Sequence, residues 1–285
     1  MAVEPTSRPG NPVTQRHPAL LGAAQAKSAG WAPGNIDLWI TPLSIARDER
    51  LFQTYHSAIS DSERVRAALF RFDSDRERFV ATRMLIRSVL SRYCGVQAQA
   101  LRFGATKHGR PYVLPDAELL GLPEFNLSHT NEVVIAAIGF GMRLGVDVES
   151  LSRPVPTEVA TRCFSLEENA GIDMLQPDAR SRRFYELWTL KECFVKAHGA
   201  GLTLSLEQFE FDLSQNGRIG VKLGADVVSV PETVVFWQFS LPDNHIAAVC
   251  SIGPEISLLP CLRATLLVPG RCESPLMLGP IRSSA

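Results

Sequence analysis

The chain of 285 residues is 45% hydrophobic and 21% charged, a globular composition that is long enough for one large domain or two of ordinary size. Its 29 basic and 30 acidic residues give a net charge of −1, so the composition offers no basic excess for nucleic acid or an anionic membrane. No apolar run reaches the roughly 18 residues of a spanning helix, and the N-terminus lacks the pattern of a signal peptide.

Prolines punctuate both ends of the chain and indicate tails around a folded middle. We predict a flexible tail over residues 1–35 and a C-terminal tail over 254–285, which contains the short apolar run 266–268. The folded middle divides into an N-terminal half, 36–141, and a C-terminal half, 142–253. None of the six cysteines belongs to a Cys-x-x-Cys pair, which favours reduced thiols in a cytoplasmic protein.

Hydrophobic periodicity predicts the elements of the first half. Residues 35–42 alternate as a β-strand does. A helix follows over 74–93, where Ser74 and Glu77 have the spacing of a capping box. Residues 125–140 predict two short strands joined by a turn.

The second half repeats this order of elements. A strand over 143–149 precedes a helix over 180–198, which ends before Gly199. Two hairpins follow over 209–221 and 233–252. Because the order repeats, we expect two related α+β halves with a ligand cleft between them.

Two carboxylates share one face of the strand over 143–149. Positions two apart lie on the same face, so Asp147 and Glu149 project together while Val146 and Val148 face the core. Neighbouring carboxylates repel each other unless a cation lies between them, and Mg²⁺ prefers such oxygen ligands. The alternative is a solvated strand face that carries two acids by chance.

The helix over 180–198 carries a second charged pair. Glu192 and Lys196 are four residues apart and share one helix face. They form either a surface ion pair, worth about 0.3–0.5 kcal/mol, or a metal ligand beside a phosphate-binding cation.

Two turns add further polar groups. The Gly/Pro turn at 106–112 holds Lys107, His108 and Arg110, which bind phosphate charges or form a basic surface turn. His129 ends the sequence Phe-Asn-Leu-Ser-His and is a candidate base, phosphate donor or ordinary turn residue. The absence of a Gly-x-Ser-x-Gly elbow and of a Walker-type loop disfavours a serine hydrolase and a P-loop nucleotidase.

Together these motifs resemble those of the phosphopantetheinyl transferases of the surfactin-synthetase-activating class. That family carries Gly-Val/Ile-Asp-Val/Ile-Glu and, further on, Trp-x-x-Lys-Glu-Ala/Ser-x-x-Lys, which residues 145–149 and 188–196 match. Upstream, the family carries Gly-Lys-Pro and Phe-Asn-x-Ser-His elements, to which Gly-Arg-Pro at 109–111 and Phe-Asn-Leu-Ser-His at 125–129 correspond. Two positions depart from the pattern: Arg110 replaces the lysine of Gly-Lys-Pro, and Cys193 replaces alanine or serine.

The resemblance implies a fold, a reaction and a metal. The fold is a pseudo-dimer of two similar α+β halves with the active site in the cleft between them. The reaction transfers the 4′-phosphopantetheine arm of coenzyme A to a serine of an acyl or peptidyl carrier protein and releases adenosine 3′,5′-bisphosphate. Asp147, Glu149 and Glu192 would hold Mg²⁺, with Mn²⁺ as an alternative ion. Glu192 and Lys196 would be catalytic, as proton acceptor and as stabiliser of the leaving group.

The resemblance also implies coenzyme A ligands and a partner. The ligands are the residues that match the family pattern: Arg66, Arg78, Arg83, Arg110, Asn126, Ser128, His129 and Lys196. Arg66 and Arg78 fit a solvated helix surface equally well. The protein would be a cytoplasmic monomer that modifies an acidic helical carrier domain and has no nucleic-acid or membrane partner. A catalytically silent coenzyme A-binding or carrier-binding protein and another Mg²⁺-dependent phosphotransferase stay open as alternatives.

Overall fold

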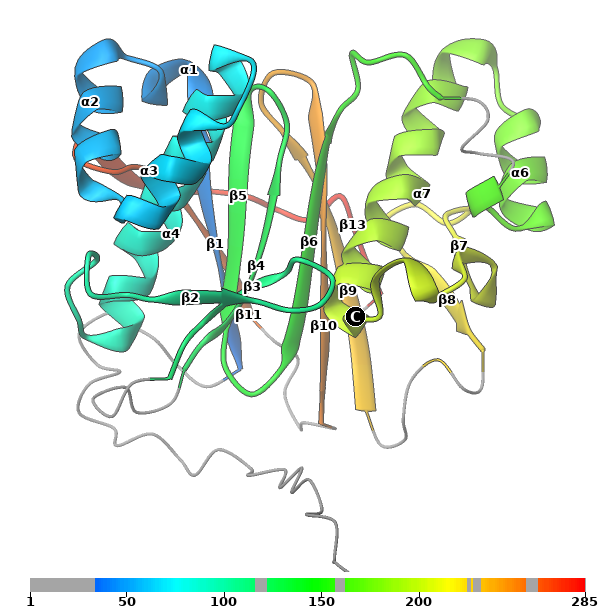
Figure 1. Cartoon of the computed structure of the whole chain (residues 1–285). Helices are drawn as coiled ribbons and strands as arrows, with labels where there is room; N and C mark the ends of the chain where they lie inside the picture. The colour runs from blue at the N-terminus through cyan, green and yellow to red at the C-terminus, as the bar shows by residue number, and fades with distance from the viewer. Residues whose placement is uncertain are drawn as a thin grey trace, which may run out of the picture.

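The computed structural model describes residues 34–115, 122–156, 162–224, 227, 232–254 and 261–284. Two β-sheets lie face to face in the middle of the molecule, and helices cover the outer side of each sheet (Figure 1). The predicted N-terminal tail lies outside the described residues except at positions 34 and 35. None of the helices in these ranges combines the length and the apolar character needed to cross a bilayer.

The first half consists of a strand, a layer of helices, a small hairpin and two more strands. Its elements are β1 (Asn35–Pro42), α1 (Leu43–Ala46), α2 (Glu49–Ala58), α3 (Asp61–Ala68), α4 (Asp73–Cys94), β2 (Phe103–Ala105), β3 (Pro111–Val113), β4 (Glu124–His129) and β5 (Val133–Gly139). The predicted first strand, long helix and final strand pair are confirmed. The sequence pattern missed α1, α2 and α3 and the hairpin of β2 and β3.

The second half follows the same order. Its elements are β6 (Arg143–Ser150), α6 (Leu166–Asp173), α7 (Pro177–His198), the 3₁₀ turns Gly201–Thr203 and Leu206–Gln208, β7 (Phe209–Asp212), β8 (Gly220–Leu223), β9 (Glu232–Leu241) and β10 (His245–Pro254). Both predicted hairpins are confirmed. Asp243 and Asn244 join β9 to β10 with φ of 55° and 57°, the left-handed conformation that a tight hairpin turn requires.

The two halves share one topology. In the first sheet, β1 lies beside β5 and β5 beside β4, and in the second sheet β6 lies beside β10 and β10 beside β9. All four pairings are antiparallel. The prediction of a pseudo-dimer of two α+β halves is therefore confirmed.

Alternation along the strands builds three separate cores. On β6, Leu144, Val146 and Val148 point into the core between the two sheets. The residues between them point the other way, towards α7. A second core lies between the first sheet and α4, and a third between the second sheet and α7. The sheet-to-sheet core is thus the surface along which the two halves meet.

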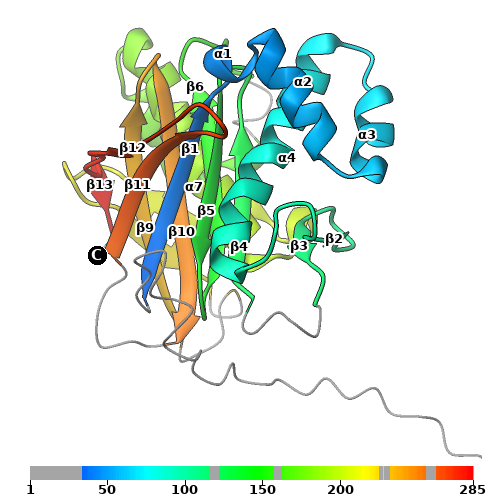
Figure 2. The ribbon, with the colours of Figure 1, turned by 90° about the vertical axis from the view of Figure 1, so that its left-hand side faces the viewer.

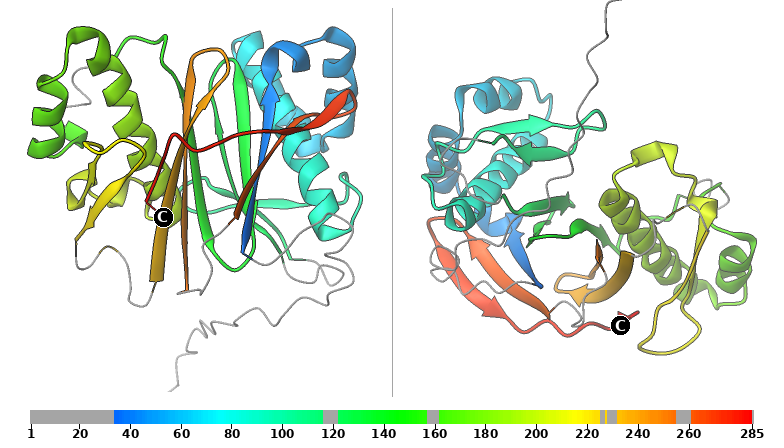
Figure 3. Two further views of the ribbon diagram at one scale, coloured as in Figure 1. Left: turned by 180° about the vertical axis from the view of Figure 1, so that it is seen from behind. Right: turned by 90° about the horizontal axis from the view of Figure 1, so that it is seen from below.

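Residues 261–284 belong to the fold, so the prediction of a tail over 254–285 is wrong for them, while residues 255–260 and 285 lie outside the described part of the chain. β11 (Cys261–Val268) pairs in parallel with β1, and β12 (Cys272–Leu276) extends that sheet further (Figure 2). The chain then crosses behind both sheets, and β13 (Arg282–Ser283) pairs with β9 (Figure 3). The segment therefore ties the two halves together.

Prolines caused this error because they occupy positions that a sheet tolerates. Pro269 directly follows β11, and Pro275 lies in β12, an edge strand. Leu267 and Val268, at the end of the predicted apolar run, are buried.

The N-terminal caps of the helices differ from the sequence prediction. Ser74 does not cap a helix: α4 begins at Asp73 after Phe72, which provides no side-chain cap. The capping boxes occur instead at Ser60 and Glu63 of α3 and at the start of α6. Gly199 ends α7 in the left-handed conformation, as predicted.

The thiols agree with the sequence reading. All six cysteines are free. Cys193, the residue that departs from the family motif, is fully buried in the core beneath α7 and is therefore shielded from solvent oxidants.

A buried ion pair fixes α7 against α6. Nζ of Lys191 lies 2.8 Å from Oε2 of Glu168, and both side chains are almost inaccessible to solvent. The same ammonium donates to the carbonyl oxygens of Leu206 and Phe209. Burial lowers the pKa of Lys191, and the Glu168 charge opposes that effect. This arrangement satisfies a buried charge completely.

Replacing Lys191 with alanine leaves the Glu168 carboxylate buried without its partner. We expect Lys191→Ala to lower the free energy of unfolding by about 3–5 kcal/mol, measured by urea denaturation. Lys222→Ala is the control, because its pair with Glu210 is exposed and should matter little. Equal stability of the two variants would contradict the structural role of the buried pair.

Candidate active site

The site begins with a close contact between α7 and β6. A Cβ atom on Gly145 would lie 1.8 Å from the carbonyl oxygen of Cys193 and 2.6 Å from the backbone nitrogen of Ala197. Only glycine therefore allows the helix backbone to rest on the strand at this point. The contact brings Asp147 and Glu149 of β6 to the helix face that carries Glu192 and Lys196.

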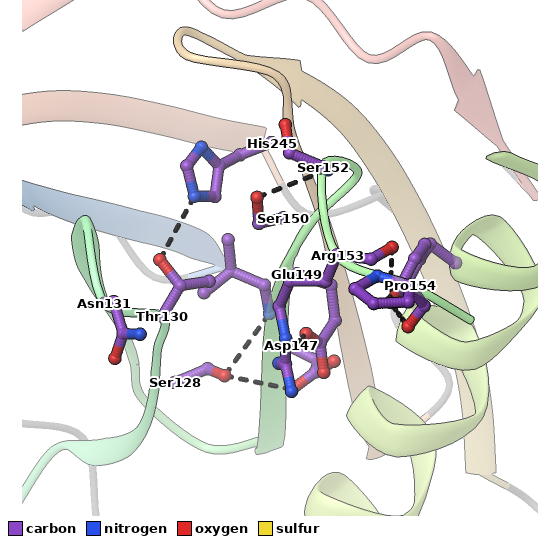
Figure 4. A network of polar contacts seen from close by, with 12 residues as sticks. Ser128, Thr130, Asn131, Asp147, Glu149, Ser150, Ser152, Arg153, Pro154 and His245 are labelled. Carbon is purple, nitrogen blue, oxygen red and sulfur yellow. Dashed lines mark hydrogen bonds and ion pairs between the residues drawn. The ribbon is translucent and has the colours of Figure 1, made fainter. Parts of the chain in front are cut away.

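Asp147 is the centre of the polar contacts. Its side chain is buried, and its Oδ1 accepts from Lys196 Nζ at 2.6 Å and from Ser128 Oγ at 2.9 Å. Lys196 also donates to Ser128 Oγ and to the carbonyl oxygen of Val146. Figure 4 shows Ser128 beside Asp147, with Glu149 further along the same strand.

Glu149 and Glu192 both lie in the field of Asp147. Burial raises the pKa of Glu149, and the Asp147 charge raises it further, while Arg153 and a hydrogen bond from Trp188 oppose the shift. Burial likewise raises the pKa of Glu192, with Asp147 adding to the effect and Lys196 opposing it. Ionising all three carboxylates is therefore unfavourable without a further cation.

The residues present fit a divalent cation in one specific respect. Oδ2 of Asp147 is buried and has no hydrogen-bond partner, and a hard cation would satisfy such an oxygen. Within the described residues, however, no three His, Cys, Asp or Glu side chains are already grouped as a metal site. Arg153 instead pairs with Glu149 at 3.2 Å, and Lys196 pairs with Asp147. Among the three carboxylates, the buried Oδ2 of Asp147 is thus the atom whose surroundings best suit a cation.

A cleft of about 730 Å³ opens beside these groups, between the two halves. The hairpin of β2 and β3 and strand β4 form one wall, and the C-terminal end of α7 forms the other. Four of the residues predicted from sequence line it: Arg110, Asn126, Glu192 and Lys196. The expectation of a cleft between the halves is confirmed.

Arg110 bridges the two walls of the cleft. Its Nη1 donates to the carbonyl oxygen of Lys196 at 2.7 Å, and its Nη2 donates to that of Phe125 at 3.0 Å. Burial lowers its pKa, and the Glu124 charge opposes that shift. The guanidinium therefore joins α7 to β4 as well as adding positive charge to the cleft.

Asn126 and Ser128 lie on β4 but contact β6. Oδ1 of Asn126 accepts from the backbone N–H of Val146 at 2.9 Å, and Oγ of Ser128 accepts from that of Val148 at 3.3 Å. Burial and the Arg78 charge lower the pKa of the neighbouring His129. A ring with a lowered pKa is neutral at pH 7 and suits hydrogen bonding better than charge pairing.

The three arginines of the first half differ in their surroundings. Arg83 forms an ion pair with Glu63 at 2.5 Å, and its guanidinium lies 4.3 Å from the centre of the Phe103 ring. Arg78 pairs with Asp75 and donates to Asn131. Arg66 is exposed, packs over the Phe79 ring, and has no carboxylate partner in the described part of the chain. The structure therefore leaves Arg66 the most available of the three.

Two contributors to the site escaped the sequence reading. Gly145 was visible as the first residue of its motif, but only the helix contact shows why glycine is needed there. Arg153 pairs with Glu149 four residues away along the chain, beyond the end of β6. No periodicity connects a strand residue with one in the loop that follows, so pattern alone gave no signal for Arg153.

Comparisons with known proteins agree on one family. The model described as the 4′-phosphopantetheinyl transferase superfamily matches residues 143–250, and the model of the 4′-phosphopantetheinyl transferase N-terminal region matches residues 46–139. The 4′-phosphopantetheinyl transferase Sfp of Bacillus subtilis is 34% identical over 219 residues, which cover 75% of this chain and 89% of the relative. HetI of Nostoc sp. is 32% identical over 219 residues, which cover 76% and 88%.

One solved structure, described as the Chronobacterium ammoniagenes ACPS-CoA complex, aligns with 40% of this chain and 98% of its own. The sequence identity is 19% and the TM-score is 0.33, values too low to support a conclusion.

The raised pKa of Glu192 predicts that the free energy of unfolding falls as this carboxyl group ionises. The folded protein holds the Glu192 proton more tightly than the unfolded chain does, so ionisation destabilises the fold as pH rises through this range. Without divalent ions, we expect Glu192→Gln to melt at a higher temperature than the wild type at pH 7. The gain should vanish at pH values below the ordinary pKa of glutamate.

Glu273→Gln is the control with the opposite sign. Its hydrogen bond from Arg92 lowers the pKa of Glu273, so this variant should lose stability at pH 7 and match the wild type at low pH. Scanning calorimetry across this pH range measures both effects. A lower melting temperature for Glu192→Gln than for the wild type at pH 7 would contradict the claim that the ionised Glu192 destabilises the fold.

Proposed function

The chain belongs to the 4′-phosphopantetheinyl transferase superfamily, and on that basis we propose which residues and which ion it uses to transfer the 4′-phosphopantetheine arm of coenzyme A to a carrier protein. The unpartnered Oδ2 of Asp147, beside a cleft lined by Lys196, is the observation that carries the proposal. The acceptor is a serine of the partner, an acyl or peptidyl carrier protein. This agrees with the lack of a nucleophile motif in the chain.

Asp147, through Oδ2, would hold a Mg²⁺ ion, with Glu149 and Glu192 as further oxygen ligands. When bound there, such an ion would supply positive charge for the pyrophosphate of coenzyme A, which three carboxylates alone would repel. Mn²⁺, which prefers the same oxygen ligands, is the alternative ion. Arg153 moves away from Glu149 at little cost because its side chain is mostly exposed.

Glu192 and Lys196 act on the reacting groups. The serine oxygen forms a bond to the β-phosphorus of coenzyme A, and the bond from that phosphorus to the bridging oxygen breaks. Adenosine 3′,5′-bisphosphate leaves. Glu192 accepts the serine proton, and its raised pKa suits this task at neutral pH. Lys196 stabilises negative charge on the leaving group.

Coenzyme A occupies the cleft between the halves. Arg110 and Lys196 bring positive charge to its two walls, while Ser128 and His129 lie on β4 outside the lining of the cleft and offer hydrogen-bonding groups next to it. For the 3′-phosphate we propose Arg66 in preference to Arg78 and Arg83. Arg78 already pairs with Asp75, and Arg83 pairs with Glu63, which also binds Arg87.

The partner and compartment follow from the same family. The carrier is an acidic helical domain, and we propose that the enzyme meets it as a monomer in the cytoplasm. Free cysteines suit a reducing compartment. Intact-mass measurement of an apo carrier mixed with the enzyme, coenzyme A and Mg²⁺ tests the function. A gain of one phosphopantetheine that chelator prevents supports both the reaction and the ion.

Asp147→Asn should remove the anchor for the ion while keeping the size of the side chain. We expect kcat for transfer to fall by at least about 100-fold, because the charge on the pyrophosphate is no longer neutralised. Calorimetric titration should show Mg²⁺ binding to the wild type in the presence of coenzyme A and not to the variant. Asp243→Asn, in the hairpin turn, is the control. Wild-type turnover by Asp147→Asn would remove the metal assignment.

Arg66 and Arg83 should behave differently when each is replaced by alanine. Arg66→Ala should raise KM for coenzyme A more than KM for 3′-dephospho-coenzyme A, since the lost contact is with the 3′-phosphate. Arg83→Ala should mainly destabilise the fold, by about 1–3 kcal/mol, because it removes a partner of the buried Glu63. Steady-state kinetics with both donors and thermal melts separate these effects. The reverse pattern would restore Arg83 as the phosphate ligand.

A further inference from the structure

The edges of the two sheets meet at a seam formed by Asn126, Ser128, Val146 and Val148. β4 is the last strand of the first sheet, and β6 is the last strand of the second. Their backbones form no ladder with each other. Instead, the side chains of Asn126 and Ser128 accept the outward N–H groups of Val146 and Val148. Side chains thus take the place that a neighbouring strand would have.

This seam adjoins Asp147 and Lys196. Val146, whose N–H bonds to Asn126, offers its carbonyl oxygen to Lys196 Nζ at 3.1 Å. The next residue is Asp147, whose Oδ1 receives the same ammonium at 2.6 Å. A shift of β6 at Val146 therefore moves both the metal anchor and the lysine that faces the leaving group.

From these contacts we infer that Asn126 is a positioning residue, which acts on the reaction through the backbone of Val146. Asn126 is 6% exposed, and its Oδ1 accepts the hydrogen bond from β6. The family resemblance assigns Asn126 to coenzyme A instead. The inference rests on the proposed function of Asp147 and Lys196. It gives the first half a part in catalysis, because Asn126 of β4 fixes the position of β6, the strand that carries Asp147 and Glu149.

Ser128 supports the same strand but cannot serve as the test. Its hydroxyl touches Asp147 and Lys196 directly, so its replacement changes the site itself. In the part of the chain that the structure describes, the Asn126 side chain bonds to the Val146 N–H and to neither of those two side chains. An effect of Asn126 on turnover must therefore pass through Val146 or through coenzyme A, and these two routes are separable.

Asn126→Ala removes the acceptor and leaves the Val146 N–H without its partner. We expect kcat to fall by about 100-fold, the cost of a small misplacement of reacting groups, while KM for coenzyme A stays within about twofold. Hydrogen exchange in the free protein should become faster at the Val146 amide. Asn126→Asp keeps an acceptor, so it should keep the slow exchange and most of kcat, although its charge raises KM for the anionic donor.

Asn169→Ala is the matched control. This asparagine also bonds to backbone groups, the carbonyl oxygens of Phe164 and Ser165, but it lies on α6. It should lose some stability and keep wild-type kcat and Val146 exchange. A general loss of stability is thereby distinguished from a change at β6.

The outcomes are distinct. A raised KM with unchanged kcat and unchanged Val146 exchange in Asn126→Ala makes Asn126 a coenzyme A ligand and overturns the inference. Unchanged exchange at Val146 overturns it whatever the kinetics show. If the wild type transfers no phosphopantetheine to any carrier, the proposed function fails, and faster Val146 exchange in Asn126→Ala still supports the contact on which the inference depends.

Discussion

Every charged group of the site depends on the contact between α7 and β6 at Gly145. The strand can approach the helix backbone there because no Cβ intervenes between Gly145 and the carbonyl oxygen of Cys193. Once the strand and the helix touch at this point, the residues two and four positions along β6 face the helix. Lys196 then reaches both Asp147 and the carbonyl oxygen of Val146. A larger residue at 145 would separate the two elements that the reaction needs together.

Lys191 and Glu192 are neighbours in sequence but point in different directions from α7, about 100° apart around the helix axis. Lys191 points into the body of the second half, where Glu168 and two backbone carbonyls bind its ammonium. Glu192 lines the cleft, where burial raises the pKa of its carboxyl group. The buried Lys191–Glu168 pair fixes the rotation of the helix, and the helix thereby directs Glu192 to the cleft. Stability and reactivity are thus divided between adjacent residues.

The sequence contained most of the local geometry of this site and little of its assembly. The two-residue period of a strand correctly placed Asp147 and Glu149 opposite Val146 and Val148, and the helical period placed Glu192 and Lys196 together. Local periods cannot show that Arg83 is bound by Glu63, because that pair is brought together by the packing of α3 on α4. They also cannot show that a proline-rich end of the chain supplies strands to both sheets, since pairing partners lie far apart in sequence. The errors at Arg83 and at the C-terminal end therefore concern long-range contacts, for which a single sequence carries no direct signal.

The seam between β4 and β6 explains why the two halves leave room for a ligand. Strands that pair through their backbones lie about 4.8 Å apart, so a continuous ladder would join the two sheets and draw their outer layers together. The side chains of Asn126 and Ser128 accept hydrogen bonds from the N–H groups of β6. Because a side chain lies between the two backbones, the strands are further apart than in a backbone ladder. The edge of β6 is thereby protected without being paired. The cleft of about 730 Å³ lies where β4 and the end of α7 diverge from this seam. A pseudo-dimer whose sheets were merged would bury the same apolar core but would lose the cleft that Arg110, Glu192 and Lys196 line.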